Sequence, residues 1–147
     1  MQRHAGLRSL SEDHHHALVE ARHLQRAGTE AAKLDLRETA ERFLTFWEAD
    51  GQAHFRREEE TLLPVYSGYG QPDAPAIVTL LVQHMRLRRL AGELAGAFRA
   101  DRVEAEPLRE LGRLFDEHVR HEERVAFPVI EEALPEDVLQ EVAARLR

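Results

Sequence analysis

Apolar residues recur every three or four positions along four long stretches of this 147-residue chain. No stretch shows the sustained alternation of apolar and polar residues that is typical of a half-buried strand. Ala, Leu, Glu and Arg, which all favour helix, dominate the composition. The sequence therefore predicts an all-α fold, an up-down-up-down four-helix bundle with a short C-terminal helix.

Capping residues, glycines and prolines mark the expected helix ends. The helices are expected from the Ser9–Glu12 capping box to about Gly28, from the Asp35 cap to Pro64, from the Asp73 cap to about Ala100, from Pro107 to Pro128 and beyond, and from Pro135 to about Leu146. The length suits one hydrophobic core. We expect a single domain over residues 1–147, with a four-helix core at about 9–130 and a C-terminal helix at about 135–146.

Charge and composition exclude several classes of function. The net charge is −7 and arginines are interspersed with acids, so we expect no nucleic-acid partner. Cysteine is absent, which excludes disulfides and thiolate metal sites. The start of the chain has no apolar signal region and no apolar run is long enough to cross a membrane, so we expect a cytoplasmic protein with no membrane association.

Two segments repeat the same chemistry. Residues 54–64 read HFRREEETLLP and residues 118–128 read HVRHEERVAFP. Both have Glu-Glu at the fourth and fifth positions after the histidine and Pro at the tenth. Residues four apart lie on one face of a helix, so each segment places a histidine and a glutamate on its apolar stripe.

The other two long stretches each carry a lone histidine, His14 or His84, on the apolar stripe. A single such histidine is more often a hydrogen-bonded core residue than a metal ligand. The set of six has no such simple explanation, because a buried carboxylate is costly unless it is paired or bound to metal. No Lys or Arg lies one turn along the stripe from Glu58 or Glu122. We therefore expect these side chains to converge on metal cations.

The ligand types restrict the metal. Nitrogen and oxygen donors without sulfur suit iron, manganese or zinc. Six side chains are too many for one tetrahedral zinc ion. Two carboxylates among four histidines fit two metal ions bridged by both carboxylates, with each ion bound by two histidines.

In these motifs the chain resembles the hemerythrin-like, or HHE cation-binding, domain family. The shared order is a lone His, His-x-x-x-Glu, a lone His and His-x-x-x-Glu, over roughly residues 7 to 130. The resemblance implies a non-haem di-iron centre bridged by Glu58 and Glu122. Its implied metal ligands are His14, His54, Glu58, His84, His118 and Glu122. We expect two iron ions, oxo- or hydroxo-bridged when oxidised, with manganese or zinc as the alternatives.

One departure from the family bears on function. The oxygen-carrying members place a further histidine one turn from the third helix's ligand, where this chain has Leu80 and Arg88. We expect at least one metal position open to a small molecule. The leading hypothesis is a protein that binds or reduces dioxygen, peroxide or nitric oxide. The alternatives are an iron-binding or iron- and oxygen-sensing module without turnover, and a mononuclear or zinc-bound structural bundle. The sequence identifies no protein partner and leaves enzymatic activity open.

Several nearby residues have two interpretations. Asp50 lies one turn before His54 and either orients its imidazole or is a solvated acid. Tyr66 and Tyr69 either close the end of the bundle, which we expect, or hydrogen-bond a metal-bound oxygen. His15 is the replacement ligand if the first helix is rotated. The other histidines are expected at the surface: His4, His16, His23 and His121.

Overall fold

The computed structural model describes residues 3–146, and these residues form helices and no strand. The predicted all-α fold is confirmed. Positions 1, 2 and 147 of the expected domain lie outside the described residues. The elements are η1 (Ala5–Leu7), α1 (Arg8–Arg26), α2 (Leu36–Phe46), η2 (Trp47–Gly51), α3 (Gln52–Arg57), η3 (Glu58–Leu62), α4 (Leu63–Ser67), α5 (Pro75–Arg99), α6 (Ala105–His121), η4 (Glu122–Ala126), α7 (Phe127–Ala133) and α8 (Glu136–Arg145).

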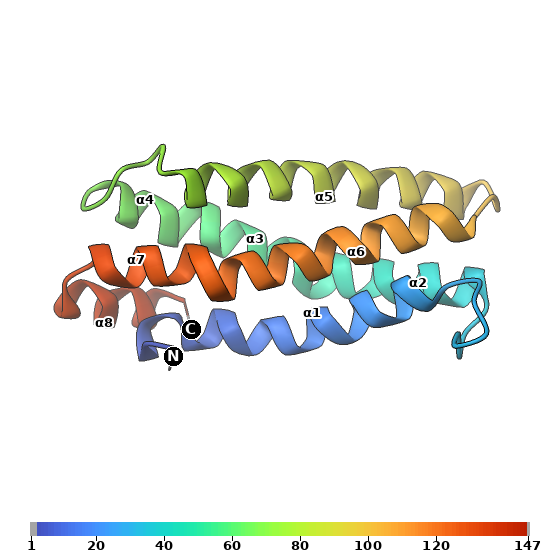
Figure 1. Cartoon of the computed structure of the whole chain (residues 1–147), viewed down its shortest axis with the longest axis horizontal. Coiled ribbons are helices and arrows are strands. Elements are labelled where there is room, and N and C mark those ends of the chain that lie inside the picture. Colours follow the sequence, from blue (N-terminus) through green and yellow to red (C-terminus); the bar gives the residue numbers. More distant parts are fainter. Residues whose placement is uncertain (1–2, 147) are drawn as a thin grey trace.

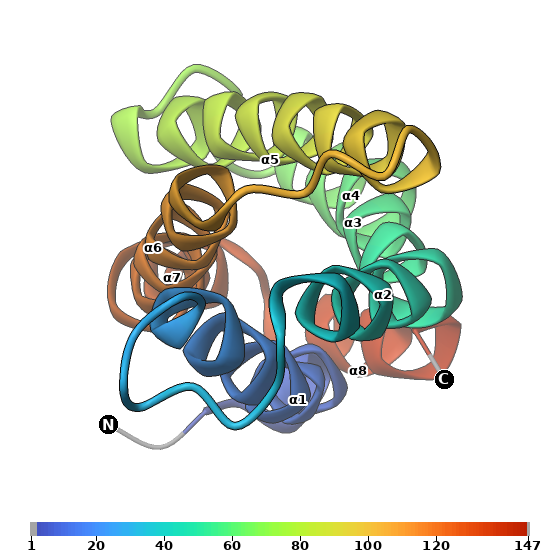
Figure 2. The same cartoon turned by 90° about the vertical axis from the view of Figure 1, so that its right-hand side faces the viewer.

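Long helical segments run side by side along the molecule. The elements α2 to α4 follow one another without a break, and so do α6, η4 and α7. Together with α1 and α5 they form an antiparallel arrangement in which successive segments reverse direction (Figure 1). Seen end-on, they surround a common interior, and α8 lies at the end of the bundle that holds η1 (Figure 2).

The helix ends partly follow the sequence signals. The Asp35 carboxylate accepts a hydrogen bond from the backbone N–H of Glu38 at 2.8 Å, as expected of an N-cap. The Ser9 capping box is wrong, because η1 leads the chain into α1 already at Arg8. Asp73 is not a cap either, since the position before Pro75 is an extended alanine without a side-chain cap. The fourth segment begins at Ala105, before Pro107.

Three π-helical turns widen the long segments, and two of them begin at Glu58 and Glu122. In each, the glutamate carbonyl accepts from the N–H five residues later instead of four. Each of these two turns comes just before a proline, Pro64 or Pro128, whose ring would collide with a carbonyl of a regular α-helix. The widened turn relieves this collision, so the helix continues past the proline. The repeated proline therefore accompanies a bulge that begins at the repeated glutamate.

The hydrophobic core consists of two clusters separated by a polar layer. One cluster includes Leu24, Phe43 and Phe115, and the other includes Leu10 and Phe127. Along each long segment, the buried histidine or glutamate stands between residues of one cluster and residues of the other. The polar layer is thus enclosed on both sides by apolar packing.

Gly112 sets the close approach of α1 and α6. A Cβ on this residue would lie 2.8 Å from the Ala21 carbonyl oxygen and 2.9 Å from the Gln25 nitrogen, both backbone atoms. We expect Gly112→Ala to lower the free energy of unfolding by about 1–3 kcal/mol, because the helices must separate. Gly92→Ala is the matched control, since a Cβ there meets nothing within 4 Å and raises helix propensity by up to about 1 kcal/mol. Urea denaturation measures both; equal effects would contradict the close-packing argument.

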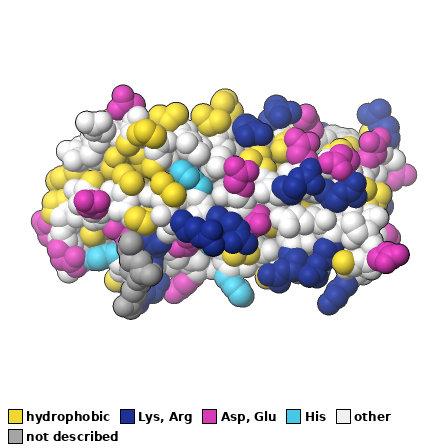
Figure 3. Space-filling view, viewed as in Figure 1, with side chains coloured by type: hydrophobic (Ala, Val, Ile, Leu, Met, Phe, Trp, Pro, Cys, Tyr) yellow, Lys and Arg dark blue, Asp and Glu magenta, His cyan; other side chains and the backbone are white. Residues whose placement is uncertain are grey.

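On the face of Figure 3, basic side chains lie among acidic ones, and hydrophobic side chains gather over the first half of α5. The exposed apolar residues on α5 are Val78, Leu81, Val82 and Met85. Within residues 3–146, no helix has the length and hydropathy needed to span a bilayer.

Candidate metal centre

The structure brings all six predicted residues into one buried cluster. One group of converging atoms comes from His14, His54, Glu58 and Glu122, and the other from Glu58, His84, His118 and Glu122. Within each group, one donor atom per residue lies within 4.8 Å of the others. The two groups share both glutamates. We name them the first position (His14 and His54) and the second position (His84 and His118).

Each long helical segment contributes to the cluster at the same level. The lone histidines come from the middle of α1 and α5, and the histidines of the repeats from α3 and α6. Glu58 and Glu122 open the π-helical turns η3 and η4, and both are completely buried. The i,i+4 spacing of the repeats therefore directs each histidine and its glutamate to the same interior point.

The converging atoms are close but poorly satisfied as hydrogen-bonding groups. The Nε2-to-carboxylate distances are 2.8 Å for His14–Glu122, 3.2 Å for His54–Glu58, 3.0 Å for His84–Glu58 and 3.1 Å for His118–Glu122. Even so, both Glu58 oxygens and the Nε2 atoms of three of the histidines have no hydrogen-bond partner. Among the described residues, neither buried glutamate has a Lys or Arg partner within ion-pair distance. Such orphaned atoms around one point fit a bound cation, which would satisfy them together.

The second glutamate of each Glu-Glu pair has a different role from the first. Glu59 lies 2.6 Å from Nδ1 of His84, and Glu123 lies 2.7 Å from Nδ1 of His14. A carboxylate only accepts, so Nδ1 carries the hydrogen and Nε2 is turned toward the cluster. Each repeat therefore provides one glutamate inside the cluster and one that orients the lone histidine of another helix.

The residue before each lone histidine completes this outer shell. Asp13 lies 3.0 Å from Nδ1 of His54, and Gln83 lies 2.7 Å from Nδ1 of His118. We call Asp13, Glu59, Gln83 and Glu123 the outer acceptors. Sequence reasoning missed Asp13 and Gln83, although both directly precede a predicted ligand. Of the two interpretations of Asp50, the solvated acid is confirmed, because its side chain is 64% exposed and lies 4.0 Å from His16.

Arginines support the three acidic outer acceptors. Arg88 pairs with Glu59 at 2.7 Å, Arg3 with Glu123 at 3.0 Å, and Arg57 with Asp13. Burial raises the pKa of Glu59 and Glu123, but the adjacent histidines and arginines outweigh it and lower each pKa to about 2. Burial also opposes the charge of Asp13, yet His54 and Arg57 hold its pKa below the usual value. All three acids are therefore anionic at neutral pH.

The imidazoles stand in a strongly negative environment. Burial lowers the pKa of His14, but Glu122 and Glu123 raise it to about 9. Burial likewise opposes charge on His84, and Glu122, Glu58 and Glu59 raise its pKa to about 10. The same surroundings favour any cation at this place, so a metal ion and protons compete for the inward nitrogens.

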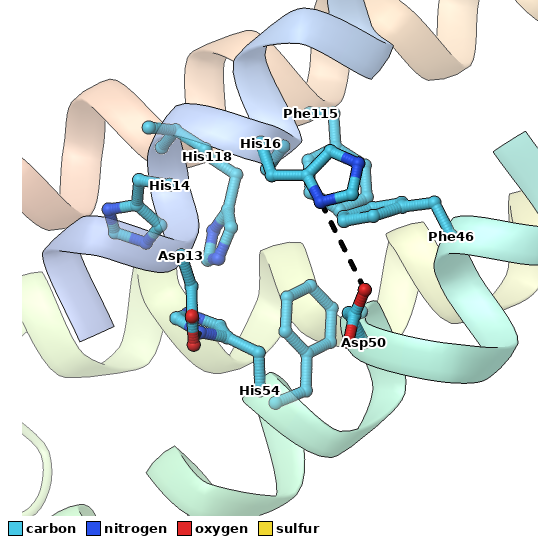
Figure 4. Close-up of a pocket in the computed structure, with 12 residues that line it drawn as sticks. Asp13, His14, His16, Phe46, Asp50, His54, Phe115 and His118 are labelled. Carbon is cyan, nitrogen blue, oxygen red and sulfur yellow. Dashed lines mark hydrogen bonds and ion pairs between the residues drawn. The ribbon is translucent and has the colours of Figure 1, made fainter. Parts of the chain in front are cut away.

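A cavity of about 200 Å³ adjoins the cluster and is bordered by His14, His54 and His118. Figure 4 shows these imidazoles on one side and His16 and Asp50 on another. The remaining wall is largely apolar and includes Phe46, Phe115 and Val119. The cavity has room for a molecule of a few atoms beside the cluster.

The remaining predicted residues take structural positions. Leu80 is fully buried in the apolar core, and Arg88 faces Glu59, so neither approaches the cluster as a donor. Tyr66 is buried and its hydroxyl donates to the Gln71 carbonyl at 2.9 Å, which closes the loop after α4. Tyr69 is 54% exposed. His15 is exposed, so it does not replace His14.

A buried His/Glu cluster of this kind in a helical bundle is compatible with a cation-binding domain. Residues 5–130 match the family model of the hemerythrin HHE cation binding domain. The chain belongs to this family, as its motifs predict. The comparison with curated proteins found no match, and neither did the comparison with solved structures.

Proposed function

We propose that this chain is a non-haem di-iron protein that binds or reduces a small oxidant such as dioxygen, peroxide or nitric oxide. The observation that carries the proposal is the pair of overlapping donor groups, which share two fully buried carboxylates and lie beside a cavity. The ligands are His14, His54, Glu58, His84, His118 and Glu122. When bound, two iron ions supply reversible electron transfer and affinity for small anions and gases.

The protein's own residues have three tasks in this function. The shared glutamates hold two cations at one place and offset their charge. The outer acceptors fix each imidazole with Nε2 inward. The apolar wall, including Phe46 and Phe115, limits water and restricts access to small molecules through the cavity.

The metal content is the first test. We expect two iron ions per chain after expression in iron-replete cells, measured by elemental analysis together with the protein concentration. Two donor groups, each with two imidazoles and two shared carboxylates, support this ratio. One zinc ion per chain would instead support the structural-bundle alternative.

The cavity gives a second prediction about reactivity. We expect azide to shift the visible absorption of the oxidised iron protein. Four histidines and two bridging carboxylates supply about eight bonds to two six-coordinate ions, so about four coordination positions remain for other ligands. Ala17→Leu, which places a larger apolar side chain in the cavity wall, should slow this shift. The zinc-loaded protein is the control, since Zn²⁺ has a filled d shell and gives no such band. An unchanged spectrum would contradict small-ligand binding.

Dioxygen separates reduction from carriage. We expect oxygen to convert the reduced protein to the ferric form, and the visible absorption spectrum measures this conversion. Many cycles of oxygen binding and release without ferric product would overturn this expectation and establish a carrier. Conversion without repeated turnover in the presence of a reductant would favour the sensing alternative.

A further inference from the structure

The cluster is built from two matching halves. Each half has a lone histidine preceded by an outer acceptor and a repeat whose second glutamate is also an outer acceptor. Asp13 on α1 accepts from His54 of the repeat at 54–64, and Gln83 on α5 accepts from His118 of the repeat at 118–128. The halves differ in the acceptor itself: Asp13 in one and Gln83 in the other.

The two repeats also differ in the residue three positions after the histidine, which forms an ion pair with the outer acceptor in the first repeat but not in the second. In the first repeat it is Arg57, which pairs with Asp13. In the second repeat it is His121, whose Nε2 lies 2.8 Å from the Ala76 carbonyl oxygen. A charged acid–arginine pair in one half thus corresponds to a neutral amide in the other. Gln83 is only 5% exposed, so water does not compensate for the missing charge.

A carboxylate and an amide act differently on a metal-bound imidazole. A histidine that donates Nδ1–H to a carboxylate becomes a more basic ligand than one that donates to a neutral oxygen. At the first position both imidazoles donate to carboxylates, Glu123 and Asp13. At the second position His84 donates to Glu59, but His118 donates to an amide.

We propose that Asp13 and Gln83 make the two metal positions inequivalent. This inference rests on the proposed two-metal site. The first position would bind a divalent cation more tightly, and its more basic imidazoles would favour the higher oxidation state of an iron ion held there. Both imidazoles of the first position, and Asp13 itself, border the cavity. His118 of the second position borders the cavity too, so a small oxidant there lies beside both imidazoles of the more electron-rich position and one imidazole of the other.

Stepwise metal affinity tests the proposal without turnover. We expect an anaerobic titration of the metal-free protein with Fe²⁺, monitored by calorimetry, to show two binding steps. Their dissociation constants should differ by about 10–100-fold. Asp13→Asn keeps the side chain's shape and removes its charge, so we expect the tighter step to weaken by about tenfold while the weaker step stays unchanged. Asp50→Asn is the matched control, because Asp50 borders the same cavity but bonds none of the four imidazoles.

Two further variants separate electronic from structural effects. Arg57→Gln breaks the same ion pair but keeps the Asp13 carboxylate on His54, so the two steps should remain distinct. Gln83→Glu should strengthen the weaker step. Mössbauer spectra of the ⁵⁷Fe-loaded protein should show two unequal iron sites that become more alike in Asp13→Asn, a change that loosened helix packing would not produce.

The outcomes are distinct from those for the proposed function. Equal weakening of both steps in Asp13→Asn, or no change in either, would overturn the inference even if azide binds and oxygen oxidises the protein. Two unequal steps that respond selectively to Asp13→Asn would support it even if the ferric protein ignores azide.

Discussion

Three successive glutamates, each changed to glutamine, should give three different losses of bound metal. We expect Glu58→Gln to abolish stable binding of two metal ions, Glu59→Gln to weaken binding by about tenfold, and Glu60→Gln to leave it unchanged. Stoichiometry by elemental analysis and affinity by Fe²⁺ titration measure these effects. The three substitutions are chemically identical and lie within one turn of helix.

The order of effects follows from where each carboxylate lies. Glu58 is fully buried, belongs to both donor groups and lies 3.0 Å from His84 Nε2, so its loss removes a shared ligand. Outer-shell changes cost about 10–100-fold in metal affinity, and removal of a direct ligand costs more. Glu59 touches only the outer nitrogen of His84, and it also holds Arg88. Glu60 is exposed and serves as the internal control.

The second repeat offers an independent check. Glu122→Gln and Glu123→Gln should reproduce the losses at Glu58 and Glu59, because Glu122 is also shared and Glu123 supports His14. His15→Ala, an exposed neighbour of His14, should retain both metal ions. Full retention of metal in Glu122→Gln would mean that the buried cluster is not the binding site.

The fold and the six clustered residues were predictable because both depend on local spacing. Apolar residues three and four apart define which face of a helix is buried, and His84 lies directly on such a stripe. The repeats fix two further ligands each by i,i+4 spacing alone. That they bind metal stays a prediction, supported by their convergence within 4.8 Å.

The outer shell was not predictable in the same way, because it depends on how helices are placed against one another. Asp13 is partly exposed, and from its own helix it falls on the water-facing side. Its partner His54 comes from α3, and no spacing within α1 reveals that contact. Asp50 lies one turn before His54, yet it falls within the π-helical turn η2, where the α-helical spacing is interrupted, and its side chain stays outside the cluster. The predicted start of the first helix was wrong for a related reason, because η1 precedes α1 and the helix begins before Ser9.

Removal of the metal should make the stability of the protein strongly dependent on pH above neutrality. In the metal-free protein the pKa of His14 is raised to about 9 and that of His84 to about 10, from about 6.5 in an unfolded chain. A raised folded-state pKa contributes stability that is fully present below pH 6.5 and is lost as the pH rises toward 9 and 10. For His14 alone the loss is on the order of 3 kcal/mol.

The acidic outer acceptors act in the opposite direction. The pKa of Glu59 and of Glu123 is lowered to about 2 from 4.5, so their contribution is present above pH 4.5 and is lost as the pH falls toward 2. The metal-free protein should therefore be most stable between about pH 4.5 and 6.5. As the pH rises toward 9 and 10, His14 and His84 become neutral in the folded protein, and the buried carboxylates lose these two positive partners.

A bound metal removes this dependence because it takes the place of the protons on the inward nitrogens. Urea denaturation of the metal-free and metal-loaded proteins at pH 6 and pH 9 measures the difference. We expect the metal-free protein to lose several kcal/mol between these pH values and the loaded protein to change much less. His15→Ala, which alters an exposed imidazole, should follow the wild type in both states. Equal stability of the metal-free protein at both pH values would mean that the cluster is held without protons, and that its negative charge is offset by something other than its histidines.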